Sequence, residues 1–213
     1  MRQRRAVVFG PLLLSATAGL GRVPHATAQP LAPTPACGDH GGSSTTAQTE
    51  GPYFKPRSPE RNSLLGPGLP GPRMVLVGRV LATNCQPIAG ALLDFWHADG
   101  TGAYDNSAYR CRGHQFTDGD GRYHPATVVP GSYPGRTRHI HVKLQPQGGA
   151  LLTTQLYFPG ERQNRADPLF RWDLEMAVAT DPADGSRIAR FEFVRPSHSL
   201  KGTPPSAREW GLP

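Results

Sequence analysis

Turn sequences rich in Gly, Pro and Asp divide this chain into short runs and so limit what it can fold into. The 213 residues include 25 glycines and 23 prolines, close to a quarter of the chain. Gly and Pro interrupt helices but form the tight turns that join strands. The turn signals are NCQP (84–87), DGTG (99–102), DGDG (118–121), PGSYPG (130–135), QGG (147–149) and DPADG (181–185).

The runs between these turns have strand character. They are 74–81, 90–98, 112–129, 139–145, 151–158 and 187–194. The sequence TDGDGRY predicts a hairpin turn, and only residues 166–179 have partly helical character. The pattern therefore predicts an all-β fold, a single antiparallel β-sandwich with long functional loops and little helix.

The N-terminus resembles an export signal. Residues 1–28 have a basic start, an apolar stretch over 6–20 and a small-residue cleavage site at Ala26-Thr27-Ala28. Arg4 and Arg5 favour the twin-arginine route, with a general secretory leader as the alternative. We expect an exported protein, periplasmic or extracellular, with no stable membrane span after cleavage. We also expect a flexible linker over 29–46 and the folded β-sandwich domain over 47–213.

The positive charge of the chain comes largely from this leader. The formal net charge is +7, but residues 1–28 hold four arginines and no acidic residue, which leaves 19 basic against 16 acidic residues, or +3. That balance is ordinary for a protein surface, so the sequence argues against a nucleic-acid-binding protein.

The three cysteines, Cys37, Cys85 and Cys111, fit an oxidising compartment. None has the C-x-x-C spacing of a metal site. The sequence favours a Cys85–Cys111 disulfide, although three pairings are open.

The stretch YPGRTRHIHVKLQ (133–145) carries the strongest chemical signal. Because side chains alternate across a strand, His139 and His141 share one face, while Ile140, Val142 and Leu144 form the apolar face. Two histidines on one face are more often hydrogen-bonded than metal-bound. A nearby phenol favours a hard, highly charged ion such as ferric iron over zinc or copper.

Five motifs together resemble the intradiol ring-cleavage dioxygenases, and most closely the protocatechuate 3,4-dioxygenase type of catalytic domain. They are QTEGPYF (48–54), DFWHADGTGAY (94–104), RGHQFTDGDGRY (112–123), PGSYPGRTRHIHVKL (130–144) and TQLYFPGE (154–161). The resemblance implies an enzyme that uses one non-haem Fe(III) per chain and O2 to cleave catechols between the hydroxylated carbons, giving cis,cis-muconate-type diacids.

The resemblance also implies site residues. Tyr104, Tyr133, His139 and His141 match the iron ligands, with Tyr109 and Tyr123 as rivals for the first tyrosine. Tyr133 matches the ligand that catechol displaces and that accepts its proton. Arg136 matches the arginine that stabilises charge on the ring, and Gln155 a glutamine near the oxygen-binding region.

Residues Thr49, Gly51, Pro52 and Tyr53 match the wall of the substrate pocket. Gly135 stands where this branch often has a bulky aromatic residue, which implies a more open pocket. The competing interpretation is a secreted β-sandwich that binds a metal or a polyphenol without catalysis. The sequence leaves open the choice of catechol and the oligomeric state, monomer or small homo-oligomer.

Overall fold

A computed structural model describes residues 43–196 of the chain. The predicted export signal, most of the predicted linker and Cys37 lie outside the described residues. Residues before the predicted domain start at 47 already contact the sandwich, since Thr45 N donates to Val194 O (2.9 Å) and Thr46 O accepts from Thr154 Oγ1 (2.7 Å). No helix among residues 43–196 is long and apolar enough to cross a membrane.

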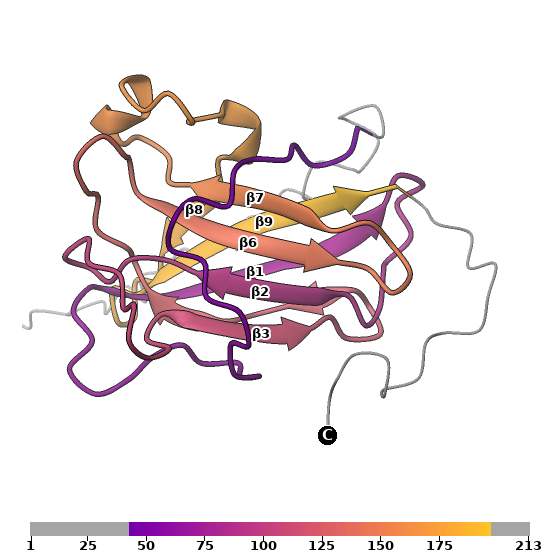
Figure 1. Ribbon diagram of the computed structural model, residues 1–213, viewed down its shortest axis with the longest axis horizontal. Helices are drawn as coiled ribbons and strands as arrows, with labels where there is room; N and C mark the ends of the chain where they lie inside the picture. Colours follow the sequence, from indigo (N-terminus) through magenta and orange to yellow (C-terminus); the bar gives the residue numbers. More distant parts are fainter. Residues whose placement is uncertain (1–42, 197–213) are drawn as a thin grey trace, which may run out of the picture. The chain divides into compact units, whose positions relative to one another are not determined.

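Two β-sheets pack face to face (Figure 1). The first has the order β3-β2-β6-β7 and is antiparallel throughout. The second has the order β4-β1-β9-β8, with β5 also paired to β1. The strands are β1 (Arg73–Ala82), β2 (Leu92–Trp96), β3 (Arg112–Phe116), β4 (Arg122–Tyr123), β5 (Ala126–Val128), β6 (His139–Gln145), β7 (Leu152–Tyr157), β8 (Ala177–Thr180) and β9 (Arg187–Arg195). The predicted all-β sandwich is confirmed.

The core lies between the sheets, where the alternation of β6 places it. Ile140, Val142 and Leu144 are at most 1% exposed and belong to the apolar cluster. Met74 and Phe193 of the second sheet complete that cluster from the other side. The histidines of β6 therefore lie on the outer face of the first sheet, the face directed away from the second sheet.

Three local predictions were wrong. The turn at 118–121 forms, with Gly121 N donating to Asp118 O (2.9 Å), but β3 and β4 pair in different sheets, so it joins the layers instead of closing a hairpin. Strand β9 runs parallel to β1, which their long separation in sequence permits. Cys111 is a buried free cysteine, so no Cys85–Cys111 disulfide forms.

The predicted partly helical stretch at 166–179 contains no α-helix. It holds the short 3-10 helix η2 (Trp172–Leu174) and the start of β8. A second 3-10 helix, η1 (Arg162–Arg165), precedes it. Both lie in the long connection after β7, at the top of Figure 1.

The N-terminal segment 45–58 crosses the outer face of the first sheet, where Figure 1 shows it in front of β7, β6 and β2. Gln48 N donates to Thr153 O of β7 (2.8 Å), and Ser58 Oγ donates to Asp94 Oδ1 of β2 (2.8 Å). This segment covers the face that carries the histidines.

Candidate functional site

The four predicted metal ligands come together on the outer face of the first sheet. His139 Nε2 lies 3.1 Å from His141 Nε2 and 3.5 Å from the hydroxyl of Tyr133. The ring of Tyr104 is 5.8 Å from that of Tyr133 and 6.4 Å from that of His141, between centroids. The hydroxyl of Tyr104 is buried and has no hydrogen-bond partner among the described residues. Such a group is costly to bury unless something binds it.

A tight turn places Tyr133 beside the start of β6. Arg136 N donates to Tyr133 O (2.9 Å), Pro134 fills the second position, and Gly135 has φ +80° in the third. This is the residue pattern of a type II turn. The turn brings Tyr133 and Arg136 to the end of the strand that carries both histidines.

The hydrogen bond of His139 fixes its tautomer. Its Nδ1 lies 2.7 Å from Thr137 O, and because a carbonyl can only accept, Nδ1 carries the proton. Nε2 therefore presents its lone pair toward His141 Nε2. A histidine held in this way is the usual arrangement for a metal ligand.

Burial keeps the candidate ligands uncharged. It lowers the pKa of His139 to about 4 and lowers that of His141 well below its ordinary value, with the neighbouring imidazole and Arg136 acting in the same direction on His141. Burial also raises the pKa of Tyr104 and Tyr133. Two neutral imidazoles and two protonated phenols surround one point, and a highly charged cation there would favour phenolate over phenol.

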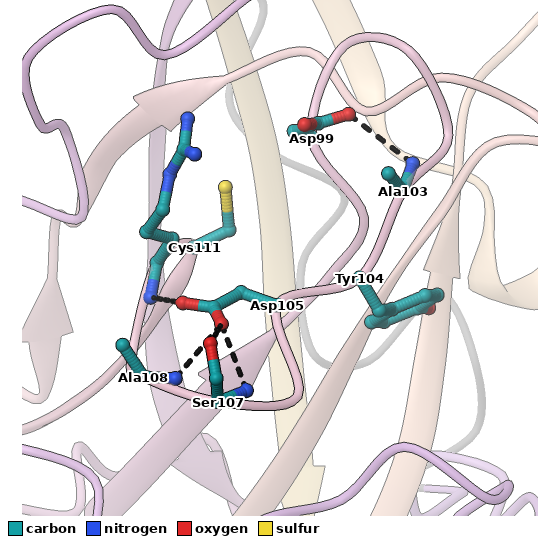
Figure 2. Close-up of a pocket in the computed structure, with 8 residues that line it drawn as sticks. Asp99, Ala103, Tyr104, Asp105, Ser107, Ala108 and Cys111 are labelled. Atoms are coloured by element: carbon teal, nitrogen blue, oxygen red, sulfur yellow. Dashed lines mark hydrogen bonds between the residues drawn. The ribbon is translucent and has the colours of Figure 1, made fainter.

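The loop that carries Tyr104 is braced by two aspartates (Figure 2). Asp99 Oδ1 accepts from Ala103 N (3.1 Å), while Asp105 accepts from the backbone nitrogens of Ala108 (2.8 Å) and Arg110 (2.9 Å). The loop lines an open pocket of about 270 Å³, and Tyr104 is one of the lining residues. These bonds hold the loop, and with it the tyrosine, against the sheet.

Arg112 joins this loop to the N-terminal segment. The side chain is buried, and it donates from Nε to Asp105 O (3.0 Å) and from Nη1 to Tyr53 O (2.6 Å). The Tyr53 ring in turn stacks on Tyr104, 4.3 Å between centroids. The sequence did not predict this role of Arg112. The available signal was the position of Arg112, a charged residue at the start of the motif RGHQFTDGDGRY.

Gln155 and Arg136 are linked directly. Arg136 Nη2 donates to Gln155 Oε1, and Gln155 Nε2 donates to Thr49 O (3.0 Å). Gln155 is fully buried and lies opposite His141 in the β6–β7 ladder. It lies on the same outer sheet face as His141, but the N-terminal segment covers it, so its amide is shielded from solvent.

The predicted pocket-wall residues differ in position. A Cβ on Gly51 would lie 3.4 Å from Cε1 of His141, so this glycine is next to the candidate ligands. Tyr53 contacts Tyr104 and meets Tyr133 edge to face, and Thr49 contacts Gln155 through its carbonyl. Pro52 is exposed in the turn that follows Gly51.

The two rival tyrosines lie elsewhere. Tyr123 is in the core, where its hydroxyl donates to Phe191 O (2.8 Å). Tyr109 donates to Pro56 O (3.0 Å), with Lys55 above its ring. Tyr104 is thus the tyrosine that the structure brings to Tyr133 and the histidines.

The donor set fits a metal that accepts phenol and imidazole ligands. Among residues 43–196, no three His, Cys, Asp or Glu side chains form a cluster suited to a metal ion. The convergent imidazole nitrogens and the buried Tyr104 hydroxyl without a partner are the groups that could hold an ion here.

Comparisons with known proteins identify the family of the chain. A family model described as "Dioxygenase" matches residues 49–193. The beta chain of protocatechuate 3,4-dioxygenase from Burkholderia cepacia is 34% identical over 125 residues, 50% of this chain and 53% of that one. Chlorocatechol 1,2-dioxygenase from Rhodococcus opacus is 29% identical over 187 residues, 72% of this chain and 73% of that one. The match to the Burkholderia cepacia protein thus spans about half of its length.

Solved structures show the same likeness. The dioxygenase domain of a dioxygenase carbohydrate-binding protein fusion from Streptomyces sp. SirexAA-E has a TM-score of 0.70 at 50% identity, over 73% of this chain and all of that one. The 3-chlorocatechol 1,2-dioxygenase of Rhodococcus opacus 1CP has a TM-score of 0.67 at 26% identity, over 71% of this chain and 72% of that one.

Proposed function

The chain belongs to the intradiol ring-cleavage dioxygenase family, and on that premise we propose that it is a non-haem Fe(III) enzyme that cleaves catechol-type rings between the two hydroxylated carbons. Both atoms of O2 enter the product, a cis,cis-muconate-type diacid. The observation that carries the proposal is the convergence of His139, His141, Tyr133 and Tyr104 at one place on the outer sheet face.

Fe(III) is the cofactor that this ligand set favours, one ion per chain. Phenolate is a hard anionic donor, which suits a hard trivalent ion better than zinc or copper. Bound ferric iron would draw electron density from a catecholate, so that the ring carbon itself becomes reactive toward O2.

Tyr133 is assigned the proton transfer that accompanies substrate binding. In its phenolate form, Tyr133 would accept one proton from a catechol hydroxyl and become a neutral phenol as the substrate takes its place among the ligands. The Tyr104 hydroxyl is buried under the stacked ring of Tyr53, which suits a ligand that stays in place. The two tyrosines would therefore have different roles.

Arg136 is assigned to charge stabilisation and Gln155 to its orientation. A guanidinium remains charged at all relevant pH values and offers several donors in one plane. The Arg136 side chain is 15% exposed, so a ligand can reach it while most of the group is shielded from water. Negative charge that develops on the ring or its oxygens would be stabilised there.

A broad range of catechols would fit this site. A Cβ on Gly135 would meet nothing within 4 Å, which supports an open pocket beside Tyr133. Thr49, Gly51 and Tyr53 would contact the substrate. The partners are then a catecholic small molecule and O2, with no nucleic acid. We also propose export from the cytoplasm, which cell fractionation would test.

Oxygen-electrode assays of iron-loaded mature protein across a catechol panel test the function. Catechol, protocatechuate and hydroxyquinol should be included, and ¹⁸O2 should label both new product oxygens. The protein should be coloured by tyrosinate-to-iron charge transfer, and catechol should shift the band. A colourless preparation with full iron content would contradict the proposal. Colour without O2 uptake would favour the competing function, non-catalytic binding of a metal or polyphenol.

A further inference from the structure

A carboxylate from the connection after β7 lies behind Arg136. The Oδ2 and Oδ1 atoms of Asp167 accept from Arg136 Nε at 3.0 and 3.2 Å. The Asp167 side chain is only 1% exposed. Burial alone would lower the pKa of Arg136, but the hydrogen bond and charge of Asp167, together with the nearby Tyr133 and Tyr157, outweigh it and raise the pKa above its ordinary value. A shielded pair of this kind is stronger than an ion pair at the surface.

The carboxylate is itself held in place by the backbone. Thr137 N donates to Oδ2 and Leu169 N donates to Oδ1, both at 2.9 Å. Asn164 of η1 holds the same strand entry, since its Oδ1 accepts from Thr137 Oγ1 (2.7 Å) and its Nδ2 donates to Phe158 O (2.9 Å). The acceptor of Arg136 is therefore fixed with respect to β6.

Two of the three guanidinium nitrogens of Arg136 are occupied. Nε binds Asp167 and Nη2 binds Gln155, whose own amide is anchored on Thr49 O. Nη1 makes no hydrogen bond to any of residues 43–196. Because the group is planar, fixing it at two points also fixes where the third nitrogen lies.

We propose that Asp167 is a positioning residue, which sets the plane of the Arg136 guanidinium so that Nη1 is the donor left for the substrate. This rests on the proposed function of Arg136. A purely structural pair would stabilise the fold in the same way but would have no effect on the chemical step. The experiment must therefore separate stability from turnover.

Asp167→Asn removes the charge and one acceptor while it keeps an oxygen for one backbone N–H. We expect kcat per bound iron to fall roughly 10- to 100-fold, because small misplacements of catalytic groups have effects of this size, with KM changed by less than about 3-fold. Asp173→Asn is the matched control. Asp173 pairs with Arg171 and accepts from Thr46, away from Arg136, so kcat should stay within about 2-fold of wild type.

Asp167→Glu and a double-mutant cycle complete the test. Asp167→Glu retains the charge but displaces the carboxylate. If Asp167 positions Arg136, kcat should fall in this variant; if only its negative charge matters, kcat should not change. In an Arg136→Met background, Asp167→Asn should cost less than about 2-fold, since the residue it positions is gone. An equal loss with and without Arg136, or unchanged kcat in soluble Asp167→Asn, would overturn the proposal.

A measurement on metal-free wild-type protein decides the matter even if the Asp167 variants do not fold. The Nε–H resonance of Arg136, identified by its loss in Arg136→Lys, should exchange slowly with water. Exchange as fast as that of the exposed Arg79 would contradict a fixed guanidinium. If wild-type protein takes up no O2 with any catechol, the proposed function fails, and this signal still tests the fixation by Asp167.

Discussion

The indole of Trp96 lies parallel to the imidazole of His141, with centroids 4.8 Å apart and ring planes 9° apart. Nδ1 of His141 has no hydrogen-bond partner among the described residues, whereas Nδ1 of His139 is held by Thr137 O. The two candidate ligands are thus oriented by different means. Stacking sets the plane of one ring, and a hydrogen bond sets the plane of the other.

Replacement of Trp96 should weaken metal binding through His141. For Trp96→Leu we expect iron affinity to fall roughly 10-fold, because groups that orient metal ligands typically contribute this much. Chelator competition on folded protein measures it. Trp172→Leu is the control, since Trp172 is 75% exposed and lies on η2. Equal iron affinity in both variants would show that stacking does not orient His141.

Tyr133→Phe should remove one phenolate from the candidate metal centre. We expect the charge-transfer band to shift and weaken and kcat to fall at least roughly 10-fold, since both a ligand and a proton acceptor are lost. Visible spectra and oxygen uptake measure the two effects. Tyr109→Phe removes a hydroxyl whose one hydrogen bond within residues 43–196 goes to Pro56 O, and it should leave both unchanged. An unaltered band in Tyr133→Phe would exclude Tyr133 as a ligand.

Gly51→Ala should affect the substrate site beyond its cost in stability. Gly51 and Gly68 have φ of +71° and +63°, so alanine at either position should cost about 1 kcal/mol in unfolding free energy. Only at Gly51 would the new methyl contact His141, because nothing lies within 4 Å of the corresponding position at Gly68. Catechol KM should therefore rise in Gly51→Ala alone. Matching KM values in the two variants would place the substrate away from Gly51.

Acid should destabilise the metal-free protein partly through His97. This histidine is buried between Ala98 O and Thr127 Oγ1, each 2.7 Å away, and burial lowers its pKa to about 4. Below pH 6.5 the unfolded chain binds a proton that the folded chain does not, so stability falls from pH 6.5 toward 4. The maximum loss from this residue is roughly 3 kcal/mol.

Urea unfolding of wild type and His97→Gln across pH 7.5 to 4.5 measures this effect. His97→Gln should be less stable at neutral pH, and the difference from wild type should narrow as the pH falls. Parallel stability curves would mean that His97 does not titrate on unfolding.

The sequence predicted β6 with its observed bounds, 139–145, because polar and apolar residues alternate there without interruption. The same alternation placed both histidines on one face. The family motifs assigned Tyr104 and Tyr133 to the same metal site as the histidines. Strand β8 was missed because its residues 177–180 are mostly exposed and have no apolar periodicity. Strands β3 and β4 lie in different sheets because β3 pairs with β2 and β4 pairs with β1. The residues of the turn between β3 and β4 do not reveal that pairing.

Asp167 could not be predicted because its role depends on distant contacts. It lies in an irregular connection, followed by Pro168, where no periodic pattern marks a buried side chain. Its partners Arg136 and Thr137 lie about 30 residues earlier in the chain. Arg112 was missed for a related reason, since its partners are backbone carbonyls of Tyr53 and Asp105, and carbonyls have no sequence signature.

One row of directly paired residues crosses the four strands β3, β2, β6 and β7, and it consists of Arg112, Trp96, His141 and Gln155. Side chains in strands alternate, so a shift of one residue in any of these strands would turn its member of the row into the core. A single-residue insertion or deletion in β6 would thus act like the loss of a ligand, even with every functional residue still encoded. Length changes in the chain can be absorbed by the turns between these strands, and the spacing within each strand is as much a part of the site as the side chains.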